Sequence, residues 1–539
     1  MTYKQKDMGI PEGERPVQAV ENPILSSPYK EPQKHWNYRQ DGSPEKADGR
    51  RPASYWFKDK RTGSAQKDLF AEEQRDDLPL INALRDDVKR WRESGYRGAS
   101  TVTQDLLNWW SRDDAPRRLF FCQREAVETL IYLLELRMPG RSSRTGYKKF
   151  VCSDKDIQRM LKGETPQGFH LADPKMAPSL VDPSANESLL PLIRLGCKMA
   201  TGSGKTVVMA MLIAWAFCNR DRNPATTNYP NGVLICAPNL TVRKRLQVLK
   251  PESVDNYYDE FEIVPAKYRS ALSKGKVHIT NWHFFAPKSP HSDGGKTSKV
   301  IDKGEEGLDA FSINRLGDLA NRLPILVLND EGHHCWRPNV DTEKAVKEEQ
   351  KGKSAEEKKN LKEEVEEARL WLEGLDKINN GGLLKPGEPG ILAAVDMSAT
   401  PFYLSGSGHP EGRPFPWLVS DFGLVDAIES GIVKIPRMPV LQKGGENTTD
   451  DAGRPDPKYF RLWKHIQDQI PAAEKVRGKP KPEAVYMQAE SALVTLAGQW
   501  KERFDGDAAA NPTQEHVPPV LIVVCDNTEI SKVFYEKIS

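Results

Sequence analysis

The chain has 539 residues, of which 38% are hydrophobic and 29% are charged, and its formal net charge is +2. This length allows roughly two to four domains and at least one large buried core. The 12 Trp and 17 Phe exclude disorder over most of the chain. No apolar run is long enough to span a membrane, and the N-terminus has no secretory signal. The seven cysteines form no C-x-x-C pair, which indicates the cytoplasm and argues against a disulfide framework.

The first part of the chain, 1–75, is polar and rich in Pro, Gly and charge. We expect it to form an arm with little regular structure that packs on the rest of the protein. A helical pattern follows over 78–110, and apolar residues at three-to-four spacing over 118–136 predict a strong amphipathic helix. We therefore predict a first region, 1–112, made of an arm and helices.

Short apolar runs then alternate with helical segments. They are β-branched and apolar at consecutive positions, as expected for parallel strands that are buried on both faces. The alternation predicts an α/β domain over 113–437, built on a doubly wound parallel sheet. The predicted strands are 193–200, 232–238, 276–281, 324–330 and 391–399.

A charged segment interrupts this alternation, with 18 charged residues among the 30 positions of 341–370. Lys and Glu at helical spacing predict a long solvated helix or helical hairpin, inserted at 341–385. A solvated face is favoured here over a specific binding surface.

The last part of the chain, 438–539, is expected to hold a linker and the beginning of another domain. The sequence from residue 421 into the Gly/Asp/Pro-rich stretch 443–457 is typical of a connection between domains. The final run PPVLIVVCDNTEISKVFYEKIS predicts one buried strand, a turn and a helix. One such unit cannot cover both faces of a sheet.

The motif MATGSGKT, residues 199–206, carries the strongest chemical prediction. Its glycines allow a tight turn that aims backbone N–H groups at phosphate, its lysine can reach the β- and γ-phosphates, and its last hydroxyl can bind Mg²⁺. A strand precedes it and an apolar helix follows, so phosphate would lie at a helix N-terminus. The general pattern has Gly where this chain has Met199, and a turn without a ligand is the alternative. The predicted nucleotide-binding residues are Thr201, Gly202, Ser203, Gly204, Lys205 and Thr206.

The motif VLNDEGHH, residues 327–334, places two carboxylates at the carboxyl end of a buried strand, where doubly wound sheets bind ligands. Asp330 is suited to bind Mg²⁺ through water, and Glu331 is suited to orient or deprotonate an attacking water. His333 could couple this site to a neighbouring one. His333, His334 and Cys335 are poorly spaced for one tetrahedral zinc ion. A strand end with ordinary polar residues is the alternative.

A third motif, with Ser398 and Thr400, follows another predicted strand. These hydroxyl groups could bond the carboxylate motif and respond to the bound nucleotide. An ordinary Ser/Thr-rich turn is the alternative, and the motif is weak by itself.

In this order, the three motifs resemble those of the first RecA-like domain of superfamily-two helicases and translocases. DEGH at 330–333 matches the family's D-E-x-H, and SAT at 398–400 matches its third motif. The resemblance implies that Gln123 reads adenine, although an exposed helix glutamine is the alternative. The segments 237–246 and 279–285 resemble the family's nucleic-acid motifs. The resemblance implies that five residues of these segments contact phosphates: Asn239, Thr241, Arg243, Thr280 and Asn281. Ordinary loop chemistry is the alternative for each.

Most of the chain also resembles the helicase-like R subunits of type III restriction enzymes and related restriction endonucleases. The resemblance rests on KMATGSGKT, NDEGHH, MSATPF, DFGLVDAIESGIVKIPR and the N-terminal NPILSSPYKEP and GRRPASYW. It implies an ATP-dependent DNA helicase or translocase that uses ATP and Mg²⁺. Double-stranded DNA would cross the opposite edge of the sheet, at the loops near 239–243 and 280–282. A methyltransferase or other modification subunit is the implied partner.

The chain departs from this family at its C-terminal part. No Q-x-x-G-R-x-x-R pattern, which would carry an arginine finger, occurs between 436 and 539. We expect an incomplete second RecA-like domain, either because the chain is truncated or because a separately encoded polypeptide supplies the remainder. Three hypotheses stay open: a motor subunit, a nucleotide- and DNA-binding fragment with little ATPase of its own, and a non-catalytic assembly subunit.

Overall fold

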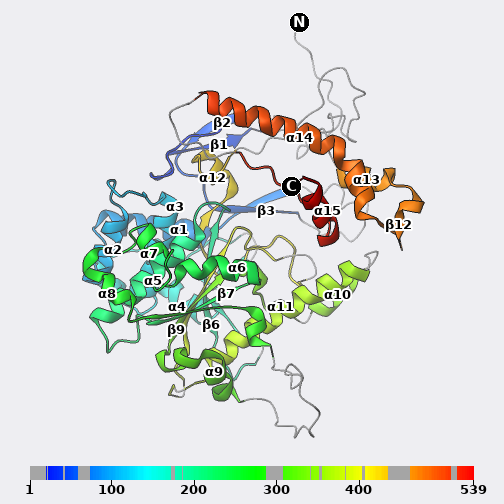
Figure 1. Cartoon of the computed structure of the whole chain (residues 1–539). Helices are drawn as coiled ribbons and strands as arrows, with labels where there is room; N and C mark the ends of the chain where they lie inside the picture. Colours follow the sequence, from blue (N-terminus) through cyan, green and yellow to red (C-terminus); the bar gives the residue numbers. More distant parts are fainter. Residues whose placement is uncertain are drawn as a thin grey trace, which may run out of the picture. The chain divides into compact units, whose positions relative to one another are not determined.

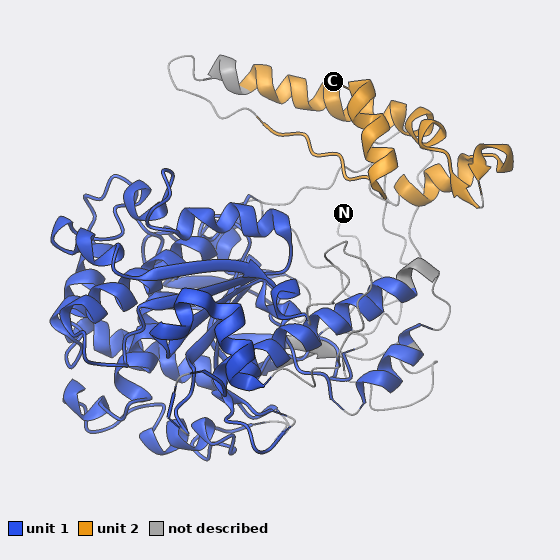
Figure 2. Cartoon of the chain, turned by 60° about the horizontal axis from the view of Figure 1, so that its bottom comes forward, with its two compact units in different colours: residues 1–434 blue, residues 435–539 orange. Residues whose placement is uncertain are grey.

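The computed structural model describes residues 20, 22–39, 43–58, 73–171, 176–184, 186–286, 307–339, 341–350, 355–382, 384–385, 387–403, 407–434, 462–476, 478–510 and 519–538. The chain divides into two compact units, 1–434 and 435–539 (Figure 2).

The first unit is built on a seven-stranded sheet with the order β11-β6-β10-β9-β7-β8, and β5 pairs with β6 (Figure 1). All pairs along this path are parallel, and β5 is antiparallel. Each of the five predicted strands is present. The strands are β5 (Val181–Asp182), β6 (Leu192–Met199), β7 (Gly232–Ala237), β8 (Lys276–Asn281), β9 (Ile325–Asp330), β10 (Ile391–Ser398) and β11 (Leu418–Phe422).

β11 corrects one prediction. We expected a connection between domains to begin at residue 421, but Leu418–Phe422 is a fully buried strand at the end of this sheet. The helix α12 (Leu424–Glu429) follows directly, and its Ala427 lies in the core. The polar residues Ser420 and Asp421 hid this strand, because they interrupt the apolar run that marks the other five.

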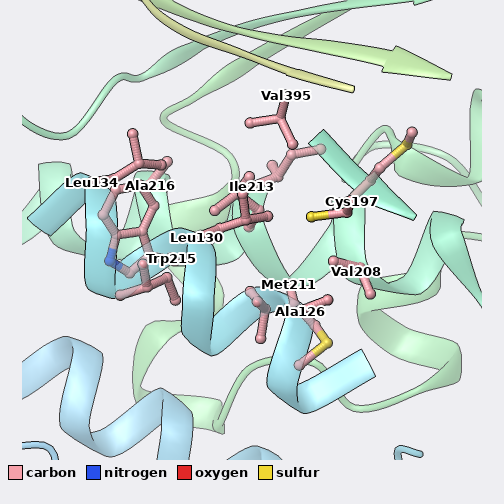
Figure 3. Close-up of a cluster of buried hydrophobic side chains, with 14 of the residues drawn as sticks. Ala126, Leu130, Leu134, Cys197, Val208, Met211, Ile213, Trp215, Ala216 and Val395 are labelled. Atoms are coloured by element: carbon pink, nitrogen blue, oxygen red, sulfur yellow. The ribbon is translucent and has the colours of Figure 1, made fainter. Parts of the chain in front are cut away.

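Consecutive apolar residues form these strands because both faces of the sheet are covered. Along β7, Val233 and Ile235 belong to one hydrophobic cluster, whereas Leu234 and Cys236 belong to another. Helices α3 (Phe121–Ile131) and α5 (Lys205–Arg222) cover the first face, and α9 (Leu308–Leu316) and α11 (Ala355–Asn379) cover the second (Figure 1). Figure 3 shows part of the first core, where Leu130 and Met211 gather with neighbouring apolar side chains. The α/β, doubly wound arrangement of the prediction is thus present.

The helices of the first unit vary widely in length. The longer ones are α1 (Pro79–Glu93), α2 (Thr101–Trp110), α3 (Phe121–Ile131), α4 (Asp154–Leu161), α5 (Lys205–Arg222), α9 (Leu308–Leu316), α10 (Thr342–Glu349) and α11 (Ala355–Asn379). The short ones are α6 (Leu240–Arg245), α7 (Tyr257–Glu260) and α8 (Arg269–Leu272). Among the described residues, no helix combines the length and apolar composition needed to cross a bilayer.

α3 confirms the helix predicted within 118–136, but it is not amphipathic in the expected sense. Ten of its eleven residues are buried, and a π-helical turn continues it over Tyr132–Arg137. Its acidic residues are buried because each pairs with an arginine. Glu125 pairs with Arg50, and Glu128 pairs with Arg92 at 2.6 Å.

The N-terminal arm has more regular structure than we predicted. It holds two antiparallel ribbons, β1 (Lys34–Tyr38) with β2 (Pro44–Asp48) and β3 (Ser54–Lys58) with β4 (Glu73–Asp77). As predicted, the arm packs on the rest of the unit. The Leu25 N–H donates to the Glu429 carbonyl at 2.8 Å, and Arg51 pairs with the Glu429 carboxylate at 2.6 Å.

The charged insertion is helical as predicted, but only part of it is solvated. The residues 358–360 near the start of α11 are exposed. The second half of α11 is buried, which contradicts the prediction of a solvated helix. Apolar residues at helical spacing bring it against the sheet: Ala368, Trp371, Leu372, Leu375 and Ile378 are each at most 1% exposed.

The second unit is mainly helical in the part that the structure describes. It contains α13 (Leu462–Gln469), a short ribbon of β12 (Lys475–Val476) and β13 (Lys479–Pro480), α14 (Pro482–Ala510) and α15 (Thr528–Ile538). The predicted C-terminal helix is α15. The predicted buried strand before it is wrong, because 520–524 forms no strand and is exposed, with Val520 at 78%, Ile522 at 75% and Val524 at 90%.

Candidate functional site

The glycine-rich loop lies between β6 and α5, as its sequence predicted. Gly202 and Gly204 have φ of +85° and +89°, which places both in the left-handed region that glycine adopts without strain. A Cβ added to Gly204 would lie 2.0 Å from Nε2 of Gln123. The conformation therefore favours glycine at position 204, and a side chain there would displace the Gln123 amide.

The residues around these glycines are arranged to receive an anion. Lys205 and Thr206 begin α5, so the backbone N–H groups of the first helical turn point toward the loop. Thr201 is exposed, whereas Ser203 is buried and its hydroxyl donates to the Ala200 carbonyl at 2.6 Å. The Ser203 side chain thus supports the turn from within. The loop fits a phosphate group.

The two carboxylates stand at the end of β9, next to this loop. Nζ of Lys205 lies 3.0 Å from Oε1 of Glu331. Glu331 has φ of +50°, which is rare and strained for a residue other than glycine. Burial and the neighbouring Glu331 carboxylate raise the pKa of Asp330 to about 6. A cation at this position would relieve the repulsion between the two carboxylates.

The protein ligands available to a metal ion here are few. In the part of the chain that the structure describes, no group of three or more His, Cys, Asp or Glu side chains could hold a metal ion. Mg²⁺ in nucleotide sites characteristically uses one or two carboxylates together with substrate phosphates and water. The Thr206 hydroxyl and the Asp330 carboxylate fit that donor set.

The third motif is brought to the carboxylates by His333. Its Nδ1 lies 2.8 Å from Oγ of Ser398 and 3.5 Å from Oε2 of Glu331. Burial and the adjacent His334 lower the pKa of His333 to about 4, so its ring is neutral near pH 7. The Thr400 N–H donates to the Ser398 hydroxyl at 3.0 Å. The predicted coupling residues are therefore in one hydrogen-bonded chain.

Gln123 contacts the glycine-rich loop directly. Its Nε2 donates to the Ser203 carbonyl at 3.1 Å, and its Oε1 accepts from the Phe120 N–H at 2.9 Å. The alternative of an exposed helix glutamine is wrong, since the residue is 4% exposed. In this arrangement the amide holds the loop, and the ring of Phe120 packs beside Tyr29 with centroids 5.7 Å apart.

The residues expected to contact nucleic acid fall into two groups. Asn239 caps α6, with its Oδ1 accepting from the Val242 N–H at 2.9 Å, while Thr241 is exposed and Arg243 is half-buried. Thr280 and Asn281 are only 4% and 6% exposed. The first group offers surface to a ligand, and the side chains of the second group offer almost none.

All these motifs lie at one end of the sheet. They follow the carboxyl ends of β6, β10, β9, β7 and β8, which are parallel neighbours in that order. The loops after β7 and β8 therefore lie at the same end of the strands as the glycine-rich loop, but toward the edge of the sheet that β8 forms, away from β6.

Sequence reasoning missed a buried polar network beneath the site. Arg194 of β6 is fully buried and donates to Asp396 of β10 at 2.6 Å and to Asp182 at 3.0 Å. Asn329 and Trp417 also donate to Asp396, at 2.8 and 2.7 Å. The available sign was the presence of Arg194 and Asp396 inside two largely apolar runs, IRLGCKM and ILAAVDMS.

Comparisons with known proteins add nothing to this geometry: no family model, curated protein or solved structure matches the chain.

Proposed function

We propose that this chain is an ATP hydrolase of the RecA-like, superfamily-two helicase type, acting on double-stranded DNA as the motor subunit of a type III-like restriction endonuclease. One observation carries the proposal. Lys205 of the glycine-rich loop after β6 and Glu331 of the acidic pair after β9 lie 3.0 Å apart, at the carboxyl end of a parallel sheet. One nucleoside triphosphate could contact both Lys205 and Glu331.

Each residue has a defined part in this proposal. The backbone around Gly202 and Gly204 would hold the phosphates, and Lys205 would exchange its partner Glu331 for a phosphate oxygen. Glu331 would then be free to accept a proton from the attacking water. Thr206 and Asp330 would hold Mg²⁺, which when bound would neutralise charge on the phosphates.

The DNA side of the proposal rests on α6. Its last turn holds Arg243, Lys244 and Arg245, which can pair with backbone phosphates without reading sequence. Asn239 and Thr241 lie at the start of the same helix. Thr280 and Asn281, which are buried, would support this surface from beneath.

A phosphate-release assay with and without linear double-stranded DNA tests the function. We expect DNA-stimulated release from the wild type and its loss in Lys205→Ala. Lys198→Ala is the matched control, because Lys198 is similarly buried and also pairs with a carboxylate, Asp421 at 2.9 Å. Equal loss in both variants would contradict a specific role for Lys205.

A nucleotide-binding measurement, made beside this assay, separates the other two hypotheses. Binding of a fluorescent ATP analogue without turnover would favour a nucleotide-binding fragment that depends on a separately encoded C-terminal part. Absence of nucleotide binding would overturn the ATPase proposal and leave the assembly subunit. The exposed apolar residues of 520–524 favour the role of an assembly subunit, because an exposed apolar segment of this kind can pair with a strand from a modification subunit.

A further inference from the structure

Helix α11 holds the segment that carries the acidic pair. Nε1 of Trp371 donates to Oδ1 of Asn329 at 3.2 Å, and Asn329 directly precedes Asp330. Four residues before Trp371 on the same helix face, Oε1 of Glu367 lies 3.8 Å from Nδ1 of His334. The helix therefore contacts the chain on both sides of the two carboxylates.

A third contact joins α11 to the chain that follows the acidic pair. Nη1 of Arg337 donates to Oδ2 of Asp376 at 2.7 Å, and its Nη2 donates to Oδ1 at 3.2 Å. Asp376 lies on the buried half of α11 and is 4% exposed. A bidentate pair fixes orientation as well as distance, so α11 also determines where the segment ends.

Both polar side-chain atoms of Asn329 are hydrogen-bonded in this arrangement. Its Oδ1 accepts from Trp371, and its Nδ2 donates to Oδ1 of Asp396 in β10 at 2.8 Å. The residue is 0% exposed, so loss of either partner would leave a buried polar atom unsatisfied. Asn329 thus links α11 to the strand that ends in Ser398.

α11 also touches the chain after β8. A Cβ added to Gly374 would lie 2.3 Å from Cγ of Phe285, so the helix and the ring approach as closely as glycine allows. Phe285 closes the short turn Trp282–Phe285, which directly follows Asn281. Gly374 is three residues from Trp371, on the next turn of the same face.

We propose that α11 is a positioning element that couples the turn 282–285 to the acidic pair, with Trp371 and Asn329 as positioning residues. Displacement of the turn would move α11 at Gly374, and α11 would move Asn329 through Trp371. The role of this coupling in an enzyme rests on the proposed function. A ligand bound to the loops after β7 and β8 would then shift the positions of Asp330 and Glu331.

Hydrogen exchange of Trp371→Phe tests the coupling without any activity. The variant keeps an aromatic ring but loses the donor to Asn329, and we expect amides of 328–335 to exchange about fivefold faster. Trp91→Phe is the control, since Trp91 is equally buried and donates to the Arg97 carbonyl at 3.1 Å. Unchanged exchange at 328–335 in Trp371→Phe would overturn the proposal.

Gly374→Ala tests the other end of the link. Its Cβ must displace Phe285, so exchange should change at 282–285 and also at 328–335. Gly498→Ala, at a helical glycine with no atom within 4 Å of the added Cβ, controls for the loss of glycine itself. A change confined to 282–285 would show that the two segments are not coupled.

Kinetics separate this inference from the proposed function. In Trp371→Phe we expect kcat of DNA-stimulated phosphate release to fall about fivefold, with KM for ATP and the affinity for DNA unchanged. A fall in ATP affinity with normal kcat would contradict a positioning role. If the wild type itself releases no phosphate, the proposed function fails, and the exchange results alone decide whether α11 couples the two segments.

Discussion

Two apolar runs in this chain are nearly alike in sequence and opposite in structure. PILVLND at 324–330 and PVLIVVCDN at 519–527 both begin with proline and end in Asn and Asp. The first forms β9, whose six residues are all buried between β10 and β7. The second forms no strand, and its residues 520–524 are exposed. An apolar run is thus only compatible with a buried strand, and its neighbours decide whether it becomes one.

The largest expected difference comes from a charge placed in each run. Val327→Asp puts a carboxylate into a fully buried strand, and we expect it to destabilise the first unit by more than about 4 kcal/mol. Ile522→Asp, at a position 75% exposed, should change the free energy of unfolding by less than about 0.5 kcal/mol. Thermal unfolding followed by circular dichroism measures both. A large loss in Ile522→Asp would show that 520–524 is buried in solution.

A smaller difference is expected from removing an acidic residue. Asp396→Ala leaves the fully buried Arg194 without its nearest carboxylate, which should cost about 3 kcal/mol. Asp526→Ala removes an exposed carboxylate from the second run and should cost less than about 0.5 kcal/mol. Urea unfolding of the two variants gives the comparison. Similar midpoints would mean that the buried network beneath the site contributes little.

The smallest effect concerns helix α11, which packs against β9 and has no counterpart over 520–524. Burial and the nearby Glu364 raise the pKa of Glu367 on α11 to about 7, while burial lowers the pKa of its neighbour His334. At Glu367 the folded state therefore keeps a proton that the unfolded state releases, whereas the lowered pKa of His334 acts in the opposite sense. The stability that Glu367 contributes is present below its unfolded pKa of about 4.5 and is lost as pH rises toward 7.

Glu367→Gln should remove this pH dependence, because the amide stays neutral. We expect the variant to gain stability relative to the wild type at pH 8 and to gain less at pH 5. Unfolding midpoints at the two pH values measure the difference. A constant offset between the proteins would show that the carboxyl group titrates normally.

The sequence allowed prediction of those features that depend on residues close together in the chain. The glycines of 202 and 204, the acidic pair and the five apolar strands all belong to this class. β11 was missed because Ser420 and Asp421 are polar, and their burial depends on partners distant in the sequence. The Arg85 guanidinium, for example, donates to the Asp421 carbonyl across 336 positions.

The same reason explains why burial at the site was not foreseen and why the prediction for α11 was wrong. Asn281 and Thr280 have residue types suited to phosphate contact, yet the fold buries their side chains. Trp371 lies just beyond the charged window 341–370, so the average charge of that window concealed the buried half of the helix. Its contact with Asn329 joins segments that no local pattern relates.

At position 331, the residue that would give the most stable backbone differs from the residue that the proposed chemistry needs. The backbone there has φ of +50°, which favours glycine, whereas the residue present is a glutamate paired with Lys205. Glu331→Gly should relieve this conformational strain and remove the carboxylate in the same step. A screen for thermal tolerance alone would therefore enrich substitutions at 331 and discard the group that the site was built around.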